Sequence, residues 1–291
     1  MKKWILLFLL LLSSVLSLKA QVENVGARTN GMGNVVTAVP DFWSVDNNVA
    51  MMPFYGKMSA GLYYDNRFLL KETSTAALGF VFPLKNKSDA FGAVLKHYGS
   101  ANYGKMKCGI SYAKSFANVF SFGLQFDYLL DYFGDIYGKR SGFTFEIGMY
   151  GQITKNFAIG FHAYNPARLK MITYNDITEY IPTVLRLGAS YTFKQKCIVA
   201  LDVVKNLDTK IQCHTGFEYK FADYLIIRGG LRFPDFSFHA GLGTAFKGLA
   251  LDFASSFHPS LGYSPQLSLK YVIPTKTDNN LQKTKNKKDT L

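Results

Sequence analysis

Few side chains in this chain of 291 residues have the spacing that catalysis requires. Ser256 and His258 lie two positions apart, so on a strand both would point to one face, as the nucleophile and base of acyl hydrolysis must. The sequence shows no third group beside them that would orient the histidine. Because a triad is defined by geometry and Ser-x-His pairs are commonplace, we expect a protein that is not an enzyme.

Metal and cofactor chemistry has equally little support. The histidines stand alone, and the cysteines have no metal-ligand spacing. Gly31-Met32-Gly33 resembles a phosphate-binding loop only in its glycines, because no strand is predicted before it and no helix after it. A tight turn is the simpler interpretation, so we predict no metal and no cofactor. The histidines are His97, His162, His214, His239 and His258.

Strand-like alternation runs along most of the chain. Within residues 120–130 every even position is apolar and the positions between them are mostly polar or glycine. Residues 143–149 and 185–193 repeat this pattern with apolar residues at odd positions. Successive strand side chains point to opposite faces, so each segment has one apolar and one polar face. This is the pattern that the wall of a membrane barrel needs.

The N-terminus has the features of an export signal. Lys2 and Lys3 precede an apolar run over residues 4–12, and a small-residue region ends at Ala20. We predict a signal peptide over residues 1–20, with cleavage near Ala20. No later window approaches the roughly 18 apolar residues that a membrane helix needs, so any spanning segments must be strands of a closed barrel.

The strand pattern predicts an all-β fold, a 14-stranded antiparallel transmembrane β-barrel over residues 57–273. Residues 21–56 lack alternation and are predicted as a short hatch or plug segment, either inside the barrel or at its periplasmic mouth. Short connections alternate with longer ones, including 133–140 and 165–180, as periplasmic turns and outer loops do. The predicted strands are 57–65, 73–83, 89–98, 103–113, 119–132, 141–152, 156–164, 181–193, 195–204, 210–220, 224–233, 236–246, 248–258 and 264–273.

Soluble sandwiches and lipocalin-like barrels also alternate, but the leader, the even strand count and the loop asymmetry favour the outer membrane of a Gram-negative cell. The polar strand positions are then predicted to line the lumen, where they either border a wet channel or neutralise one another in a filled one. These residues are Gln125, Asp127, Glu146, His162, Arg186, Asp202, Gln212, His214, Glu218, Arg228, Arg232, Asp252 and Lys270.

The net charge of +13 raises the question of nucleic acid. Part of this excess lies in the leader and in a basic tail over residues 274–291, predicted as a flexible periplasmic extension, and the rest forms no basic stripe. We therefore expect no nucleic-acid partner and favour outer-membrane lipid head groups or lipopolysaccharide. Tyrosines near predicted strand ends fit two interfacial girdles, although aromatics are enriched in any strand. They are Tyr63, Tyr64, Tyr98, Tyr103, Tyr132, Tyr191, Tyr219, Tyr224 and Tyr271.

Cys108, Cys197 and Cys213 are predicted to be unpaired thiols. A hairpin turning at residues 206–210 would place Leu201, rather than Cys197, opposite Cys213.

Three groups of motifs resemble the PorV/PorQ-like outer-membrane proteins, which are similar in fold to FadL, the long-chain fatty-acid transporter. The first group lies at the start of the mature chain, the second at residues 165–166 and 181–188, and the third at residues 255–269. The first group consists of Gly26-Ala27-Arg28, Gly31-Met32-Gly33, Asp41-Phe42-Trp43 and Asn47-Asn48-Val49-Ala50.

The resemblance implies an N-terminal hatch inside the barrel and passive binding or transport of a small hydrophobic or amphipathic ligand. Residues of the hatch, Gly31, Gly33, Asn47, Asn48 and Ala50, would then gate the lumen. Exposed apolar residues of the long loop would capture the ligand, unless they pack on their own loop. The alternatives that stay open are an accessory role in type IX secretion with secretion-system proteins as partners, or a structural role. The loop residues are Met171, Ile172 and Tyr174.

Overall fold

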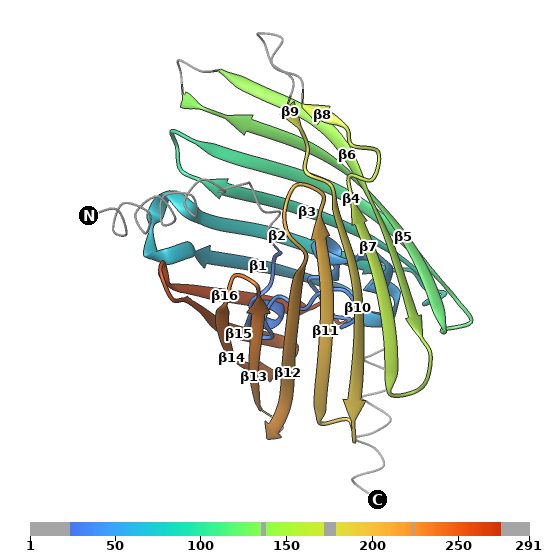
Figure 1. Cartoon of the computed structure of the whole chain (residues 1–291). Helices are drawn as coiled ribbons and strands as arrows, with labels where there is room; N and C mark the ends of the chain where they lie inside the picture. The colour runs from blue at the N-terminus through green and yellow to red at the C-terminus, as the bar shows by residue number, and fades with distance from the viewer. Residues whose placement is uncertain (1–23, 135–137, 172–178, 223, 275–291) are drawn as a thin grey trace, which may run out of the picture.

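The computed structural model describes residues 24–134, 138–171, 179–222 and 224–274. Fourteen antiparallel strands close into one barrel, in which β1 (Ser59–Asn66) pairs with both β2 (Ser74–Pro83) and β16 (Gly262–Val272). Figure 1 shows the strands wrapping around the N-terminal segment. The other wall strands are β3 (Asp89–Gly99), β4 (Gly104–Phe116), β5 (Phe120–Tyr132), β6 (Lys139–Gln152), β7 (Phe157–Tyr164), β10 (Val184–Phe193), β11 (Cys197–Asn206), β12 (Gln212–Ala222), β13 (Leu225–Phe233), β14 (Ser237–Phe246) and β15 (Leu249–His258).

The two ends of the barrel differ. One end carries the tight turns between β2 and β3, β4 and β5, β6 and β7, β10 and β11, β12 and β13, and β14 and β15; we call it the turn side. The other, the loop side, carries the loop with η2 (Arg67–Leu69) and η3 (Lys71–Thr73), and the connection with the small sheet β8 (Lys170–Met171) and β9 (Glu179–Tyr180). The predicted long connections lie on the loop side, but the β13–β14 and β15–β16 connections on that side are as short as the turns, so the predicted alternation of short and long connections holds only in part.

The barrel is apolar outside and polar inside. On β5, Ser121, Gln125 and Asp127 are buried in the lumen, whereas Phe126 is 63% exposed on the outer face. Phe143 on the neighbouring β6 is 70% exposed in the same way. An outer surface of this kind is stable only where lipid covers it. The alternation of the sequence thus gives a transmembrane barrel, as predicted.

Residues 24–56 lie inside the barrel as four short helical turns, and we call this segment the hatch. Its elements are α2 (Ala27–Gly31), α3 (Ser44–Asn47), η1 (Val49–Met51) and α4 (Met52–Tyr55). Most of its residues are buried, because the barrel wall surrounds them. Of the two positions predicted for this segment, the structure shows the one inside the lumen. Within the described part of the chain, no helix has the length and apolarity needed to cross a membrane.

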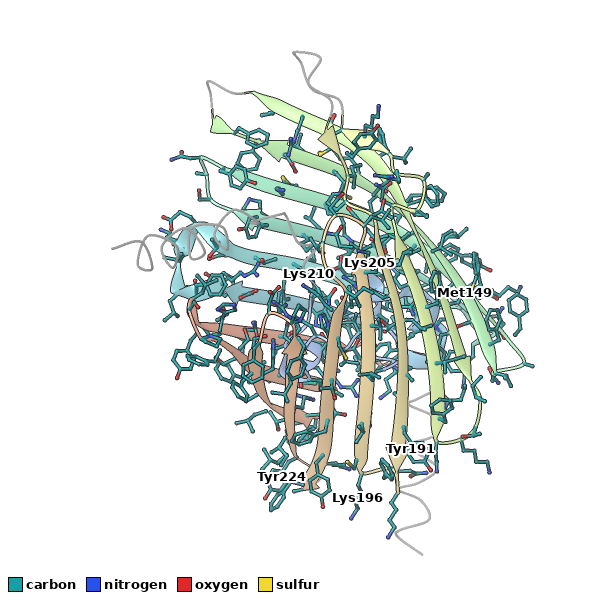
Figure 2. The ribbon with its side chains drawn as sticks, in the orientation of Figure 1. Met149, Tyr191, Lys196, Lys205, Lys210 and Tyr224 are labelled. Carbon is teal, nitrogen blue, oxygen red and sulfur yellow. The ribbon has the colours of Figure 1, made fainter. Side chains whose placement is uncertain are left out.

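Several local expectations differ from the structure. Cys213 pairs with Val203, and Leu201 pairs with Thr215. The turn is centred where it was predicted, at residues 206–210, so the expected pairing of Cys213 with Leu201 was wrong by two residues. All three cysteines are free, as predicted. Tyr63 is not part of a girdle: it points into the lumen and is 3% exposed. Tyr191 and Tyr224 do lie on the outer face, near the turn side (Figure 2). The short strands β8 and β9, within the connection predicted as a loop, were missed.

The predicted signal peptide, and the basic tail apart from residue 274, lie outside the described residues.

Candidate functional site

A belt of inward-facing glycines lets the hatch lie directly against the backbone of the barrel wall. Nearly every wall strand places a glycine or alanine inward at mid-height. A Cβ atom at Gly160 would meet the carbonyl oxygen of Thr37, and one at Gly216 would meet the carbonyl oxygen of Met32. Only glycine allows the hatch backbone to approach the wall this closely. The glycine belt consists of Gly61, Gly79, Gly92, Gly109, Gly123, Gly148, Gly160, Gly188, Gly216, Gly230 and Gly241.

Asp202 on β11 anchors the middle of the hatch. One oxygen of its carboxylate, Oδ2, accepts hydrogen bonds from the backbone amides of Val36 and Thr37 at 2.8 and 3.0 Å and from the Thr37 hydroxyl at 2.7 Å. The hydroxyl of Ser190 donates to the carbonyl of Ala38 at 2.6 Å. Asp202 is fully buried, so these charge-assisted bonds form out of contact with water. We call residues 36–40 the hatch linker.

Asn47 and Asn48, two of the predicted hatch residues, tie the hatch to itself and to the wall. The amide nitrogen Nδ2 of Asn48 donates to the Thr37 carbonyl at 2.8 Å and to the Met149 carbonyl of β6 at 3.2 Å. Asn47 exchanges hydrogen bonds with the backbone of Val25, which closes the first half of the hatch onto the second. Both side chains are buried, and their predicted gating role stays a prediction.

The remaining predicted hatch residues make close backbone contacts. The carbonyl of Ala50 accepts a hydrogen bond from the Ser121 hydroxyl of β5. Gly31 packs against Gly241 of β14, so closely that a Cβ atom added at Gly31 would lie only 3.0 Å from the Gly241 Cα atom. Gly33 has a φ of +73°, which a glycine adopts without strain, and it ends the turn after α2. Gly31-Met32-Gly33 is therefore a turn packed on the wall.

Ion pairs join α3 of the hatch to the wall. Asp46 lies 3.1 Å from the ammonium of Lys96 on β3 and 2.6 Å from that of Lys107 on β4. Burial alone would raise the pKa of Asp46, but Lys107 and Lys96 outweigh it and hold that pKa well below its usual range. Lys107 also lies 2.9 Å from Glu146, whose other oxygen is 2.7 Å from His162. The carboxylate of Asp46 is thus charged and held by two cations.

A second charged group holds the start of the hatch. The guanidinium of Arg28 donates to both oxygens of Glu218 on β12, at 2.7 and 2.8 Å, and to the carbonyl of Pro40 at 3.1 Å. Glu218 in turn accepts from Arg228 of β13, which also pairs with Asp252 at 2.8 Å. Burial acts to lower the pKa of Arg28, but Glu218 more than compensates and raises it above its ordinary value. Charges of both signs neutralise one another here. Of the two alternatives predicted for the polar lumen residues, this arrangement is the filled lumen and not the wet channel.

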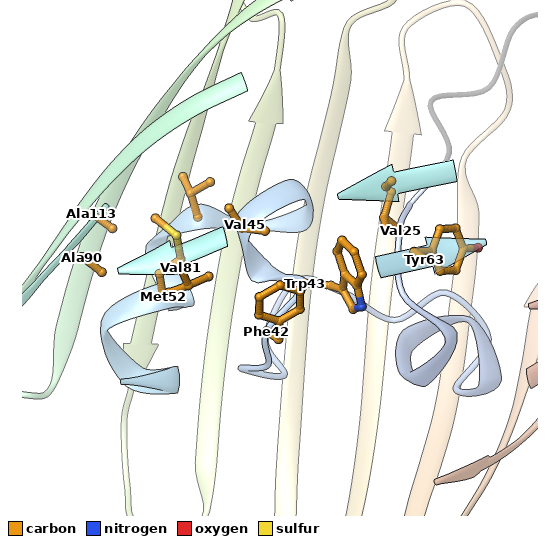
Figure 3. Packing of buried hydrophobic residues seen from close by; sticks show 11 residues of the cluster. Val25, Phe42, Trp43, Val45, Met52, Tyr63, Val81, Ala90 and Ala113 are labelled. Atoms are coloured by element: carbon orange, nitrogen blue, oxygen red, sulfur yellow. The ribbon is translucent and has the colours of Figure 1, made fainter. Parts of the chain in front are cut away.

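Apolar packing supports the same segment. Phe42 and Trp43 contact each other edge to face, with ring centroids 4.8 Å apart, and Trp43 packs on Tyr63 of β1. Figure 3 shows these rings with the other residues of the cluster between the hatch and strands β1–β4. Where the rings meet the wall, Gly61 lies against Phe42 and Gly79 lies against both rings, and the absence of side chains there leaves room for them. The hatch therefore has a core of its own inside the barrel.

The structure places the predicted lumen residues inside the barrel. Most are buried; Arg232 and Gln212 are half-buried near the loop side, and Lys270 is half-buried near the turn side. Three of them contact the hatch directly: Asp202 and Glu218 as described, and His214, whose Nδ1 lies 3.1 Å from the Asn34 carbonyl.

The predicted loop residues differ from expectation. Met171 is not an exposed capture residue: it is 7% exposed and packs with Tyr164, Ile181 and Val184, because β8 folds back onto the wall. Ile172 and Tyr174 lie outside the described residues.

The Ser-x-His pair forms no catalytic arrangement among the described residues. The hydroxyl of Ser256 accepts a long hydrogen bond from Gln266, and His258 accepts one from the backbone amide of Ser260. Among the same residues, no cluster of three or more histidine, cysteine or carboxylate side chains has the arrangement of a metal site.

Neither the glycine belt nor the anchoring role of Asp202 was predicted from the sequence. The inward glycines share the parity of the polar positions on each strand, so their repetition in the middle of successive strands was the available signal. No pattern in the sequence indicates which wall residues contact the backbone of the hatch.

Comparisons with known proteins agree on the fold. No family model matches the sequence, and no curated protein sequence matches it significantly. Among solved structures, the toluene transporter TbuX of Ralstonia pickettii is similar at a TM-score of 0.65 and 13% identity, covering 87% of this chain and 100% of that one. The toluene transporter TodX of P. putida gives 0.66 and 13%, covering 88% and 100%.

A Pseudomonas aeruginosa FadL homologue is similar at a TM-score of 0.66 and 13% identity, covering 86% of this chain and 99% of that one. The FadL-like part of the predicted resemblance is thus confirmed for the fold, and the PorV/PorQ part stays a prediction. The chain has the fold of the FadL-type barrels.

Proposed function

We propose that this chain is an outer-membrane channel that passively binds and passes small hydrophobic or amphipathic molecules. The observation that carries the proposal is the hatch: it fills the lumen, and the contacts described above join it to the wall without a covalent cross-link. A barrel of fourteen strands is wide enough to hold such a plug. The plug excludes a wide aqueous pore, and its hydrogen bonds and ion pairs can be exchanged as a molecule passes.

The fold likeness supports the same proposal. Two of the similar structures are toluene transporters and one is a FadL homologue, and in each case nearly the whole of that protein aligns with this chain. The apolar outer band supports residence in a bilayer, and exposed lysines near both rims, such as Lys196 and Lys210 (Figure 2), are suited to anionic lipid head groups.

Uptake of toluene by cells that lack other hydrocarbon channels tests the proposal. Wild-type protein is expected to accelerate uptake, and Asn48→Ala is expected to change it severalfold, because the variant loses the bonds to Thr37 and Met149. Asn86→Ala is the matched control, since the side chain of Asn86 bonds to Ser88 in the β2–β3 turn and to Asp89 at the start of β3, away from the hatch. If wild-type protein gives no uptake above the empty membrane, the transport proposal fails.

Native mass spectrometry of the mature protein in mild detergent gives an independent reading. A hydrophobic molecule retained at one per barrel supports transport. An empty barrel that holds a secreted or periplasmic protein would instead support a role in protein export.

A further inference from the structure

A pocket of about 250 Å³ opens on the turn side, where the hatch meets the wall. The hatch contributes Arg28, Val39, Pro40 and Phe54. The wall contributes residues of β6, β7, β10 and β11, and Lys155 and Asn156 come from the β6–β7 turn. The wall residues are Tyr150, Gln152, Ala158, Ser190, Thr192 and Ile198.

The position of the pocket relates it to the hatch linker. Thr37 is fixed by Asp202, and Ala38 by Ser190; the next two residues, Val39 and Pro40, already line the pocket. The linker is therefore hydrogen-bonded to the wall at residues 37–38 and borders the open space of the pocket at residues 39–40. A molecule that passes the hatch beside β10 and β11 would enter this space.

The lining combines an apolar surface with uncompensated positive charge. Val39, Phe54 and Ile198 offer apolar contact, while Tyr150 and Gln152 are hydrogen-bonded to each other at 2.6 Å. Among the described residues that line the pocket, two are cations and none is an aspartate or glutamate. Arg28 is neutralised by Glu218 behind it. The exposed Lys155 has no ion-pair partner among the described residues, so the rim carries its charge.

We propose that this pocket, the exit pocket, binds a small molecule that has an apolar body and one carboxylate group, on the turn side of the hatch. Its volume lies just below the roughly 300–1,000 Å³ of sites for drug-sized ligands, so it selects small molecules such as a single-ring acid. The apolar body lies against Ile198 and Phe54, and the carboxylate faces Lys155. The inference rests on the proposed transport function and identifies where an acidic cargo is held before release.

Calorimetric titration of the detergent-purified mature protein with benzoate tests this site, with benzyl alcohol as the neutral ligand of similar size and empty micelles as the blank. Wild-type protein is expected to bind benzoate more tightly than benzyl alcohol. Ile198→Trp fills the pocket and is expected to weaken both ligands more than tenfold. Lys155→Gln is expected to weaken benzoate about threefold and to leave benzyl alcohol unchanged.

Lys196→Gln is the matched control, because Lys196 carries the same charge in the neighbouring β10–β11 turn and does not line the pocket. Equal effects of the Lys155 and Lys196 changes would reduce the binding to general surface charge and overturn the inference. Absence of benzoate binding to wild-type protein would do the same. Because the titration needs no transport, loss of the site with intact toluene uptake refutes only this inference, whereas bound benzoate without uptake refutes only the transport proposal.

Discussion

Asp202→Asn is the sharpest perturbation of the hatch, because it changes one atom group and leaves the packing volume almost the same. The native carboxylate accepts three hydrogen bonds from the hatch linker, two from amides and one from a hydroxyl. The asparagine keeps a neutral carbonyl acceptor at the same place. The barrel wall itself is expected to remain intact, since the β10–β11 and β11–β12 ladders do not involve this side chain.

The size of the effect follows from the charge. A hydrogen bond to a charged group contributes roughly 1.5–3 kcal/mol and one between neutral groups roughly 0.5–1.5 kcal/mol, so each bond loses about 1 kcal/mol. Three bonds give about 3 kcal/mol of lost linker attachment. Since about 1.4 kcal/mol is a factor of ten, local opening of the linker should become about 100-fold more frequent.

Hydrogen exchange measured by mass spectrometry on a peptide covering residues 34–40 reads this opening directly, because the amides of Val36 and Thr37 are the donors concerned. Asp131→Asn is the matched control: Asp131 is also a buried wall carboxylate, but it pairs with Arg140 near the loop side, away from the linker. Unchanged exchange in this peptide for Asp202→Asn would refute the anchoring role of Asp202. Equal acceleration throughout the barrel would show general destabilisation instead.

Two further changes test the glycine belt and the ion pairs of α3. Gly160→Val should displace the linker, because the valine side chain would occupy the place of the Thr37 carbonyl. The fluorescence emission of Trp43, the only tryptophan after residue 4, should then shift to longer wavelength. Gly151→Ala is the control and should leave the emission unchanged, because the nearest atom to an added Cβ there is 3.4 Å away. An unshifted spectrum for Gly160→Val would contradict the close fit. Asp46→Asn should cost the hatch about 3–5 kcal/mol at pH 7, because Lys96 and Lys107 lose a buried partner. The folded-state pKa of Asp46 is lowered, so its contribution is complete above an unfolded-state pKa of about 4 and is lost as the pH falls toward the folded value. Protease resistance of the hatch should therefore differ between variant and wild type at pH 7, and the difference should begin to shrink only below about pH 4 and continue to fall toward the folded-state pKa. A difference that grows on acidification would contradict the stabilising role of the charged Asp46.

The barrel is largely determined by the sequence alone. Alternation over segments such as 120–130 assigns each residue to one of two faces, because the side-chain period of a strand is two whatever lies next to it. The order of turns and loops then follows along the chain, so strand count and orientation were predictable. Residues 1–20 predict export in the same local way, and this stays a prediction because they lie outside the described residues.

The interior was decided by the tertiary structure. Tyr63 has the composition of a girdle residue, yet it points into the lumen and accepts a hydrogen bond from Asn30. Met171 lies in a long connection and was therefore predicted to be an exposed loop residue, yet β8 buries it against Tyr164. Asn30 lies 33 positions from Tyr63, and the cluster that buries Met171 also contains Val204, which is 33 positions away. A local pattern does not report contacts over such separations.

The hatch shows the same division most clearly. Its existence followed from the loss of alternation over residues 21–56, and its family-like motifs pointed to Asn47 and Asn48. Its attachment by Asp202, Glu218 and the glycine belt depends on the closed barrel, because only closure places strands from β6 through β12 around the hatch. In the sequence, Asp202 is one polar strand residue among many. It becomes an anchor because the backbone amides of Val36 and Thr37, 166 and 165 positions away, lie opposite it in the folded barrel.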